Sequence, residues 1–216
     1  MARDGAATRA LIMDAAQKLI LRHGFAATSV EAVLEQTGLT KGAFFHHFPS
    51  KNDLARALME RFAEQDETTL RSTLERAERL TKDPVQQVLV FVGLLEEMME
   101  QSGNSNPGCL YATYSYEAQL FDDETHELIK KALLAWREEL GAKIRQALEH
   151  RPPRIPVNAE ELADGLTVVI EGAYVLSRAF KEPKLVLDQL RHYRNYLEMV
   201  FGEVRVEMDV PASVSS

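Results

Sequence analysis

The chain has 216 residues, 45% of them hydrophobic, which is enough to bury a sizeable core in one compact unit or in a small domain joined to a larger one. Its formal net charge of −8 excludes a surface that is basic throughout. The charge is uneven, because residues 1–56 carry seven Lys or Arg against five Asp or Glu, whereas residues 57–216 carry 18 against 28. We therefore expect contact with nucleic acid only in the N-terminal part, since an acidic body repels it.

The composition favours a cytoplasmic location. Cys109 is the only cysteine, so no internal disulfide can form, and this suits a reducing compartment. Arg3 and Asp4 lead into an amphipathic segment and not into the apolar core of a signal peptide. No run of about 18 apolar residues occurs, so we expect no membrane partner.

The first two predicted helices lie in the N-terminal part. Apolar residues at helical spacing mark residues 6–23, and Gly24 ends that helix. Thr28 and Glu31 have the spacing of a capping box, in which Thr28 caps the second helix and Glu31 reaches back to it. Gly38 ends the second helix, because glycine enters a left-handed turn at little cost.

A third, short helix completes a helix-turn-helix. Thr40 caps it and Pro49 ends it, and Ser50 with Asp53 forms a second capping box that opens the next helix. Two short helices joined by a tight turn with Gly form a motif whose second helix can enter the major groove of DNA. The sequence therefore predicts a three-helix DNA-binding domain at residues 1–52.

The rest of the chain is predicted to be a helical bundle. The helix that opens at Ser50 keeps its apolar period to about Leu80 and joins the two parts. Five more helices are expected, at residues 84–101, 109–120, 122–150 and 158–180, and from beyond Pro183 to residue 201. With no strand predicted, we expect an all-α fold of about nine helices, with the bundle at residues 53–202 and a disordered tail at 203–216.

Three N-terminal segments stand at a specific spacing. GFAATSV, TGLTKGAFFHHF and FPSKNDL follow one another within roughly residues 8–58. Together they resemble the TetR family of transcriptional regulators. The resemblance implies that the helix-turn-helix binds double-stranded DNA, and that the bundle binds a small-molecule effector and a second copy of the chain.

Nine residues are candidates for contact with DNA. Lys51 lies in the first turn of a helix, where an external phosphate would offset its unfavourable position. Lys41 can pair with guanine, Ala43 can touch a thymine methyl group, and Gly42 lets the backbone approach DNA closely. Phe45 stands where the family usually has a tyrosine, so it lacks the hydroxyl that would reach a phosphate. The candidates are Thr28, Thr40, Lys41, Gly42, Ala43, Phe45, His46, His47 and Lys51.

Several of these candidates have a plain structural alternative. Lys51 is also consistent with a solvated lysine, and Gly42 with simple tolerance in a short capped helix. Thr28 matches a phosphate contact of the family, but its capping role alone would explain it. His46 and His47 are potential donors to bases or phosphates, but as neighbours on a helix they point different ways and make a poor metal pair.

The last two predicted helices are candidates for a dimer interface. A single helix-turn-helix reads few base pairs, so such proteins usually dimerise and read half-sites about 34–36 Å apart. The resemblance also implies an interface here, as a four-helix bundle from two subunits. The same apolar faces would equally serve as core within one chain. The candidates are Leu162, Leu166, Val169, Ala173, Ser177, Leu190, Tyr193, Leu197 and Phe201.

Aromatic and methionine residues gather in the middle helices, where the resemblance implies an effector pocket. Such a lining suits a small, largely apolar effector, although each residue is equally consistent with ordinary core. The candidates are Phe91, Met98, Tyr111, Tyr114, Phe121, Trp136 and Tyr174. Possible polar anchors are Glu117, His126, Glu171 and Arg178.

The leading hypothesis is a dimeric repressor that binds a palindromic operator and is released by the effector. The sequence has no GxGxxG, Walker, HExxH, CxxC or GxSxG motif, so we expect no enzyme, no catalytic residue, no metal and no cofactor. One alternative is a non-catalytic helical interaction module with a vestigial helix-turn-helix. Another is a redox-responsive regulator that uses Cys109.

Overall fold

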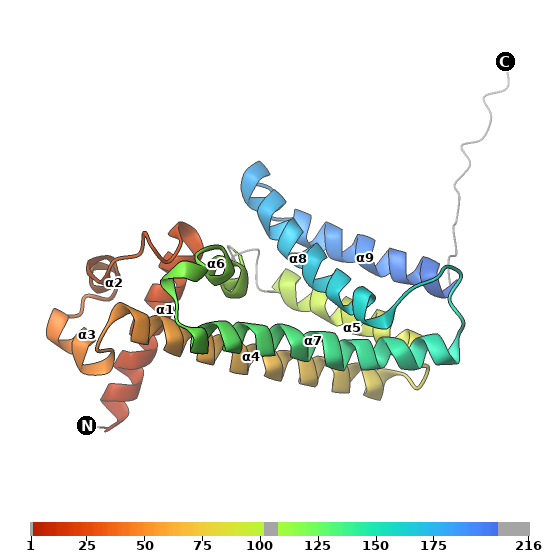
Figure 1. The fold of residues 1–216 in the computed structure, drawn as a ribbon, viewed down its shortest axis with the longest axis horizontal. Helices are drawn as coiled ribbons and strands as arrows, with labels where there is room; N and C mark the ends of the chain where they lie inside the picture. The colour runs from red at the N-terminus through yellow and green to blue at the C-terminus, as the bar shows by residue number, and fades with distance from the viewer. Residues whose placement is uncertain (1, 102–107, 203–216) are drawn as a thin grey trace, which may run out of the picture.

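The computed structural model describes residues 2–101 and 108–202, and it confirms the all-α fold, with no strand in these residues (Figure 1). The tail expected at residues 203–216 lies outside the described residues. None of the helices in the described part combines the length and the hydropathy needed to cross a bilayer. The helices are α1 (Ala2–His23), α2 (Val30–Thr37), α3 (Lys41–His47), α4 (Lys51–Leu80), α5 (Pro84–Gln101), α6 (Leu110–Tyr116), the 3₁₀ helix η1 (Ala118–Leu120), α7 (Asp123–His150), α8 (Ala159–Phe180) and α9 (Leu185–Phe201).

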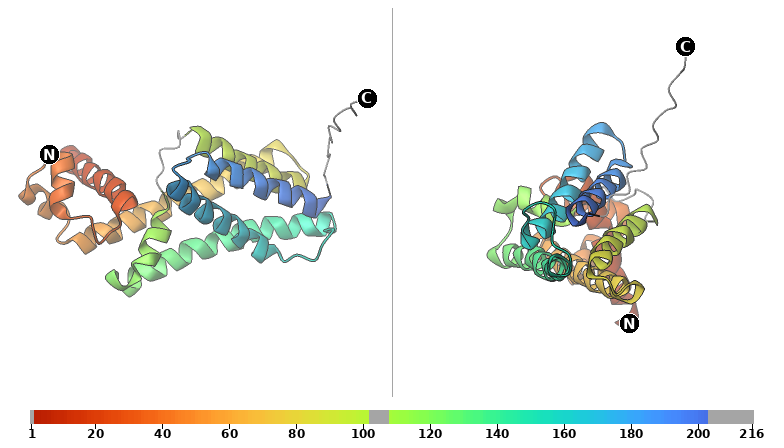
Figure 2. Two further views of the ribbon diagram at one scale, coloured as in Figure 1. Left: turned by 90° about the horizontal axis from the view of Figure 1, so that it is seen from above. Right: turned by 90° about the vertical axis from the view of Figure 1, so that its right-hand side faces the viewer.

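The molecule is elongated, with α4 and α7 running side by side along its long axis (Figures 1 and 2). Helices α1, α2 and α3 form one end, where α1 contacts α2, α3 and α4. Helices α5, α8 and α9 complete the bundle at the other end, and α6 contacts both α1 and α4. This places α6 between the helix-turn-helix of α2 and α3 and the bundle.

Two hydrophobic clusters hold these helices together. The N-terminal cluster combines α1, α2 and α3 with residues 54–59 of α4 and with Leu110, Tyr111 and Tyr114 of α6. The C-terminal cluster combines the rest of α4 with α5, α7, α8 and α9. Helix α4 belongs to both clusters, because its first part packs in the N-terminal cluster and the rest packs in the C-terminal cluster. The domain boundary expected after residue 52 stays a prediction.

The cap of α2 is Ser29 and not Thr28. Ser29 has an extended backbone (φ −90°, ψ 158°), and its Oγ accepts a hydrogen bond from the N–H of Ala32 at 3.1 Å. Thr28 is buried, and its hydroxyl donates to the carbonyl of Gly24 at 2.8 Å. The capping box predicted from Thr28 and Glu31 is wrong, because Thr28 still belongs to the turn that follows α1 and the next residue faces the free N–H groups.

The other predicted caps of the helix-turn-helix are confirmed. Gly38 ends α2 in a left-handed conformation with φ 70°. Thr40 caps α3 by accepting from the N–H of Ala43 at 3.3 Å. Ser50 caps α4 by accepting from the N–H of Asp53 at 3.1 Å. These local features fix where α2 ends and where α3 and α4 begin.

Two helices have limits that differ from those expected. Helix α1 begins at Ala2 and not at residue 6. The helix expected at residues 109–120 ends at Tyr116, because Glu117 leaves the helical conformation (φ −113°, ψ 30°), and η1 follows. This break sets the direction of the Glu117 side chain, which is important for the site described below.

The correction at the start of α2 gives a stability prediction. We expect Ser29→Ala to lower the free energy of unfolding by about 1 kcal/mol, because the N–H of Ala32 loses its partner. Urea denaturation followed by circular dichroism measures the change. Glu31→Ala is the matched control, and a loss as large as that of Ser29→Ala would show that a capping box through Glu31 is present after all.

Candidate functional site

Helix α3 is anchored on one side and open on the other. Phe44 and Phe48 are buried in the N-terminal cluster and hold α3 against the neighbouring helices. Seven of the nine candidate DNA contacts lie on α3 and its cap. Of these, Thr40, Lys41, Gly42, Phe45 and His46 are exposed, and Ala43 and His47 are half-buried.

Lys41 is held loosely at the start of α3. Its ammonium lies 3.2 Å from a carboxylate oxygen of Glu31, and the two side chains are 64% and 69% exposed. It also lies 6.0 Å from the centre of the Phe45 ring. An exposed ion pair of this kind is weak and exchanges readily for another anion. Lys41 is therefore available to a phosphate or to a base edge.

Lys51 and Thr28 face the protein interior. The Lys51 Nζ donates to the carbonyl of Phe25 at 2.5 Å and lies 4.1 Å from the centre of that ring. Burial lowers the pKa of Lys51, while the negative charge of Glu117 raises it. The Thr28 hydroxyl is bonded to the carbonyl of Gly24. Both side chains thus bind the loop after α1, and their contact with phosphate stays a prediction.

Glu117 connects the bundle to that same loop. One of its carboxylate oxygens accepts from the N–H of Phe25 at 2.6 Å and the other accepts from the N–H of Ala26 at 3.3 Å. Gly24 precedes this pair with φ 86°, and a Cβ added there would lie 3.0 Å from Glu117 Oε1. The bond therefore needs glycine at position 24, both for its backbone conformation and for space.

Three of the four expected polar anchors bind elsewhere. Glu117 binds the loop after α1, and Arg178 of α8 donates to the carbonyl of Leu21 at 2.5 Å. His126 bonds through Nε2 to the carbonyl of Ala118 at 2.9 Å. Sequence reasoning missed that Glu117 and Arg178 both bind near the end of α1, because each partner is far away along the chain.

A cavity of about 320 Å³ lies between α4, α5, α6, α7 and α8. Met98, Tyr111, Trp136 and Tyr174 line it, as do Phe62, Asp66, Cys109 and Glu171. Three of the seven expected residues do not. Phe91 is buried in the C-terminal cluster, whereas Tyr114 and Phe121 stack on each other at 4.2 Å beside the N-terminal cluster.

Asp66 is the polar centre of the cavity wall. Its Oδ2 accepts from Trp136 Nε1 at 2.7 Å and from the Tyr111 hydroxyl at 3.1 Å. Burial raises the pKa of Asp66, and these two hydrogen bonds lower it. Asp66 therefore orients two aromatic rings of the lining. This role could not be predicted from the sequence, because a single Asp in a long helix looks like any surface residue.

Cys109 and Glu171 form a second polar pair in the lining. Burial raises the pKa of the Cys109 thiol, and the charge of Glu171 raises it further. Burial also raises the pKa of Glu171, which the hydrogen bond from the thiol lowers. A thiol held in its protonated form is a poor nucleophile, and the redox role of Cys109 stays a prediction.

The predicted dimer face is mostly core of the same chain. Seven of its nine residues are buried, and Tyr193 donates from its hydroxyl to the carbonyl of Leu162 at 2.5 Å. The buried residues are Leu162, Leu166, Ala173, Leu190, Tyr193, Leu197 and Phe201, whereas Val169 and Ser177 are half-buried. The seven side chains are core of their own chain, and an interface through them stays a prediction, because helical spacing marks an apolar face without saying which helix covers it.

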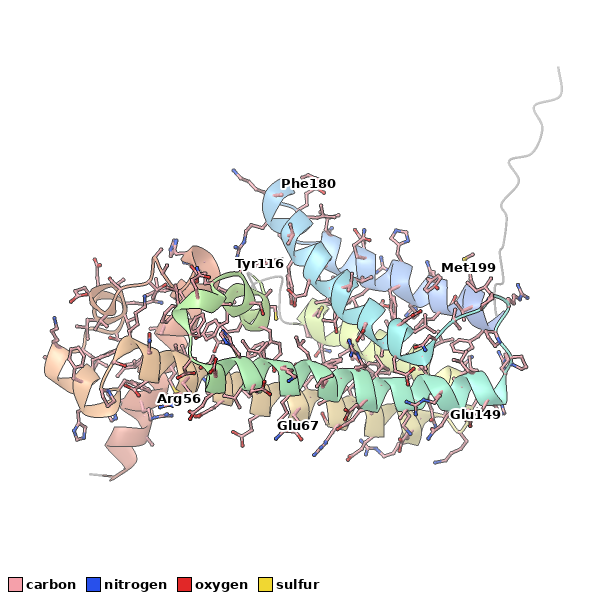
Figure 3. All side chains as sticks on the ribbon, viewed as in Figure 1. Arg56, Glu67, Tyr116, Glu149, Phe180 and Met199 are labelled. Carbon is pink, nitrogen blue, oxygen red and sulfur yellow. The ribbon has the colours of Figure 1, made fainter. Side chains whose placement is uncertain are left out.

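The opposite side of the same two helices carries exposed apolar residues. Val168, Val175 and Leu176 follow one another at helical spacing on α8, and Phe180 and Met199 mark the two ends of the surface in Figure 3. We call this surface the α8/α9 outer face. It consists of Val168, Val175, Leu176, Phe180, Tyr196 and Met199, which are 40% to 69% exposed.

Two family models match the chain. The model described as bacterial regulatory proteins of the tetR family matches residues 12–58, and the model described as the tetracyclin repressor-like C-terminal domain matches residues 84–193. The chain belongs to the TetR family. It is thus a TetR-family transcriptional regulator, and members of this family bind DNA. The first TetR match includes all of α2 and α3, where the exposed candidate residues lie.

Other TetR-type regulators are similar along most of the chain. The HTH-type transcriptional repressor DhaR of Mycobacterium sp. (strain GP1) is 23% identical over 178 residues, which are 82% of this chain and 85% of DhaR. The HTH-type transcriptional regulator LmrA of Bacillus subtilis (strain 168) is 26% identical over 180 residues, covering 81% and 88%. A TetR-family crystal structure from Agrobacterium tumefaciens superposes with a TM-score of 0.74 at 20% identity, covering 91% of this chain and 99% of that chain. The TetR fold therefore extends beyond the helix-turn-helix into the bundle.

The bond from Glu117 to the loop gives a second prediction. We expect Glu117→Ala to lower the free energy of unfolding by about 1–3 kcal/mol, because it removes the acceptor of the buried Phe25 N–H. Hydrogen exchange at the Phe25 amide should accelerate in step. Glu124→Ala is the control, since Glu124 pairs on the surface with Arg56 at 2.8 Å. Unchanged exchange at Phe25 in Glu117→Ala would contradict the bond.

Proposed function

We propose that this TetR-family regulator is a cytoplasmic homodimer that represses transcription. Each copy would bind one half of a palindromic operator through α3, and a small, largely apolar effector in the cavity would release the dimer. The observation that carries the proposal is the outer side of α3. It is open to solvent, while Phe44 and Phe48 fix its inner side in the N-terminal cluster. A recognition element needs this combination of rigidity and access.

The residues of α3 suggest how it would read DNA. Lys41 can exchange its surface partner Glu31 for guanine or a phosphate, and Ala43 can face a thymine methyl group. Gly42 is exposed and has no side chain that would keep the backbone from the duplex. His46 and the ring of Phe45 lie on the exposed side, where phosphate and sugar would pass.

The α8/α9 outer face supports a dimer. Monomeric proteins rarely expose a large contiguous apolar patch. Two adjoining helices here expose six large apolar side chains, and two copies related by a twofold axis would cover them as a four-helix interface. A symmetric dimer would also supply the second α3 that a palindromic operator requires. The interface that we propose thus uses the helices expected from the sequence, with the opposite side facing the partner.

Helix α6 supports a link between the cavity and DNA binding. At its start, Cys109 and Tyr111 line the cavity. Near its end, Tyr114 donates from its hydroxyl to the carbonyl of Ala55 at 3.2 Å, and Glu117 follows with its bonds to the loop after α1. A ligand that shifts α6 would therefore move the support of the helix-turn-helix. It must bind the released conformation more tightly, because equal affinity shifts nothing.

DNA binding tests the proposal directly. In a gel-shift with the DNA upstream of its own gene, the protein should form a site-specific complex whose affinity falls as salt rises. Lys41→Ala should weaken that complex about 10-fold, because it removes a contact to a base or a phosphate. Lys82→Ala is the control, since Lys82 is exposed at the far end of α4.

A folded dimer that forms no specific complex at moderate salt would overturn the proposal. Binding that does not respond to salt would favour the alternative of an interaction module with a vestigial helix-turn-helix, because phosphate contacts release counterions. Equal losses in Lys41→Ala and Lys82→Ala would show that α3 is not the reading element.

The α8/α9 outer face is tested by oligomeric state. We expect Val168→Glu and Val175→Glu to convert the dimer to a monomer in sedimentation experiments, because each buries a charge in the interface. Leu80→Glu is the control at a position that is 61% exposed outside this face, and it should leave the dimer intact. A monomeric wild-type protein, or dimers in both face variants, would contradict the interface.

A further inference from the structure

We propose that the cavity binds an organic cation, whose positive charge pairs with Asp66 and Glu171 and whose apolar body lies against the aromatic lining. This names the chemical class of the effector, and it rests on the proposed function only for its consequence at DNA. Binding itself follows from the cavity alone.

Two acidic side chains from different helices reach this cavity. Asp66 comes from α4 and Glu171 from α8, and both lie in a lining that otherwise consists mainly of aromatic, aliphatic and sulfur-containing side chains. Burial raises the pKa of each carboxyl group, and the hydrogen bonds from neutral donors offset this effect only in part. A bound cation would supply that compensation.

In the part of the chain that the structure describes, no basic side chain pairs with either acid. Within the described residues neither Asp66 nor Glu171 takes part in an ion pair, and their bonds come from neutral donors, namely Trp136, Tyr111 and Cys109. Arg178 is a basic residue near the edge of the lining. Its Nη2 lies beside Gly108, where an added Cβ would be 3.5 Å away from it. It donates to the carbonyl of Leu21, at the end of α1. The carboxylates thus remain available to a ligand.

The aromatic lining suits a cation as well as an apolar body. Trp136 and Tyr111 are oriented by their bonds to Asp66 Oδ2, and Phe62 packs edge-on against Tyr111 at 4.8 Å. The faces of such rings attract ammonium groups, most strongly where water is excluded. Asp66 Oδ1 accepts no hydrogen bond within the described residues. A charge beside it would be close to both a carboxylate and oriented rings.

An acidic groove adjoins the cavity at Asp66. This open groove of about 960 Å³ lies between α4 and α7, and Asp66 and Trp136 belong to the linings of both spaces. Eight Asp or Glu and four Lys or Arg line it, including Arg56 and Glu67, which are labelled in Figure 3. A groove with more carboxylates than basic groups and with walls of low dielectric constant raises the local concentration of cations. The field on this side therefore favours the same sign of ligand as the cavity.

Other classes of ligand fit less well. An anionic effector would meet two buried carboxyl groups and no free basic partner in the described lining. A neutral apolar effector would occupy the volume but would supply no positive charge to pair with the carboxylates of Asp66 and Glu171. The structure therefore discriminates between ligands of equal shape by their charge.

Three probes of similar size test this discrimination. Benzyltrimethylammonium carries the charge, neopentylbenzene is its neutral isostere, and phenylacetate is a small aromatic anion. Trp136 is the only tryptophan of the chain, so its fluorescence reports a ligand at the wall between the cavity and the groove without DNA, and Glu171, which lines only the cavity, distinguishes the two. We expect the cation to bind at least about 10-fold more tightly than the neutral isostere and phenylacetate not to bind.

Two variants locate the charge. Asp66→Asn keeps an acceptor for Trp136 and Tyr111, and Glu171→Gln keeps one for Cys109, so both should retain the fold by circular dichroism. Each should lose about 10-fold in affinity for the cation and little for the isostere. Glu75→Gln is the control on the surface of α4, where its carboxylate is 69% exposed, and it should bind like the wild type. If Asp66→Asn fails to fold, Glu171→Gln alone still tests the inference.

Equal or tighter binding of neopentylbenzene or phenylacetate would overturn the inference. So would a cation affinity that is unchanged in Glu171→Gln and in folded Asp66→Asn. If the cation binds as expected but leaves the DNA complex intact in a gel-shift, the inference stands and effector release is contradicted. If the protein binds no DNA at all, the fluorescence titration still decides the ligand class.

Discussion

The relation between the helix-turn-helix and the bundle depends on one short loop that is held from two sides by opposite charges. The N–H groups of Phe25 and Ala26 donate to the carboxylate of Glu117, and the carbonyl of Phe25 accepts from the ammonium of Lys51. Gly24 makes this possible, because its left-handed conformation turns the chain after α1. Charged groups form stronger hydrogen bonds with the backbone than neutral groups do, so the loop is well fixed.

This loop connects the two functional regions through α6. Helix α6 has only the residues Leu110–Tyr116, yet its first turn lines the cavity and its last turn enters the N-terminal cluster. A packed helix of this length moves as a unit, since cores resist continuous deformation. The connection from cavity to α3 is accordingly short and passes through side chains that are already in contact.

Local signals in the sequence were sufficient for the fold but not for the interfaces. The end of α2 could be predicted from Gly38 and the start of α3 from Thr40, because caps depend on neighbouring residues only. The cap of α2 itself is one residue later than predicted, because Thr28 and Ser29 can both cap a helix and only the folded turn decides between them. The role of Glu117 could not be predicted, because its partner Phe25 lies 92 positions earlier.

The same limit applies to α8, which is apolar on two sides. Leu166 and Val168 are equally plausible interface residues by spacing, yet one is buried in its own chain and the other is 69% exposed. Phe91 and Met98 lie on the same helix, yet Phe91 is buried in the C-terminal cluster and Met98 lines the cavity. Composition predicts an aromatic interior but not which rings border empty space.

The passage of α4 through both hydrophobic clusters limits how this protein can be divided. A fragment that ended near residue 60 would contain the whole helix-turn-helix, but it would expose Leu54 and Leu58 and would lack Leu110 and Tyr114, which complete their surroundings. The helix-turn-helix part is therefore not an independent domain that recombination could join to an unrelated bundle. Exchange between relatives would have to carry the α6 segment along, so the helix-turn-helix and the part of the bundle that supports it are inherited together.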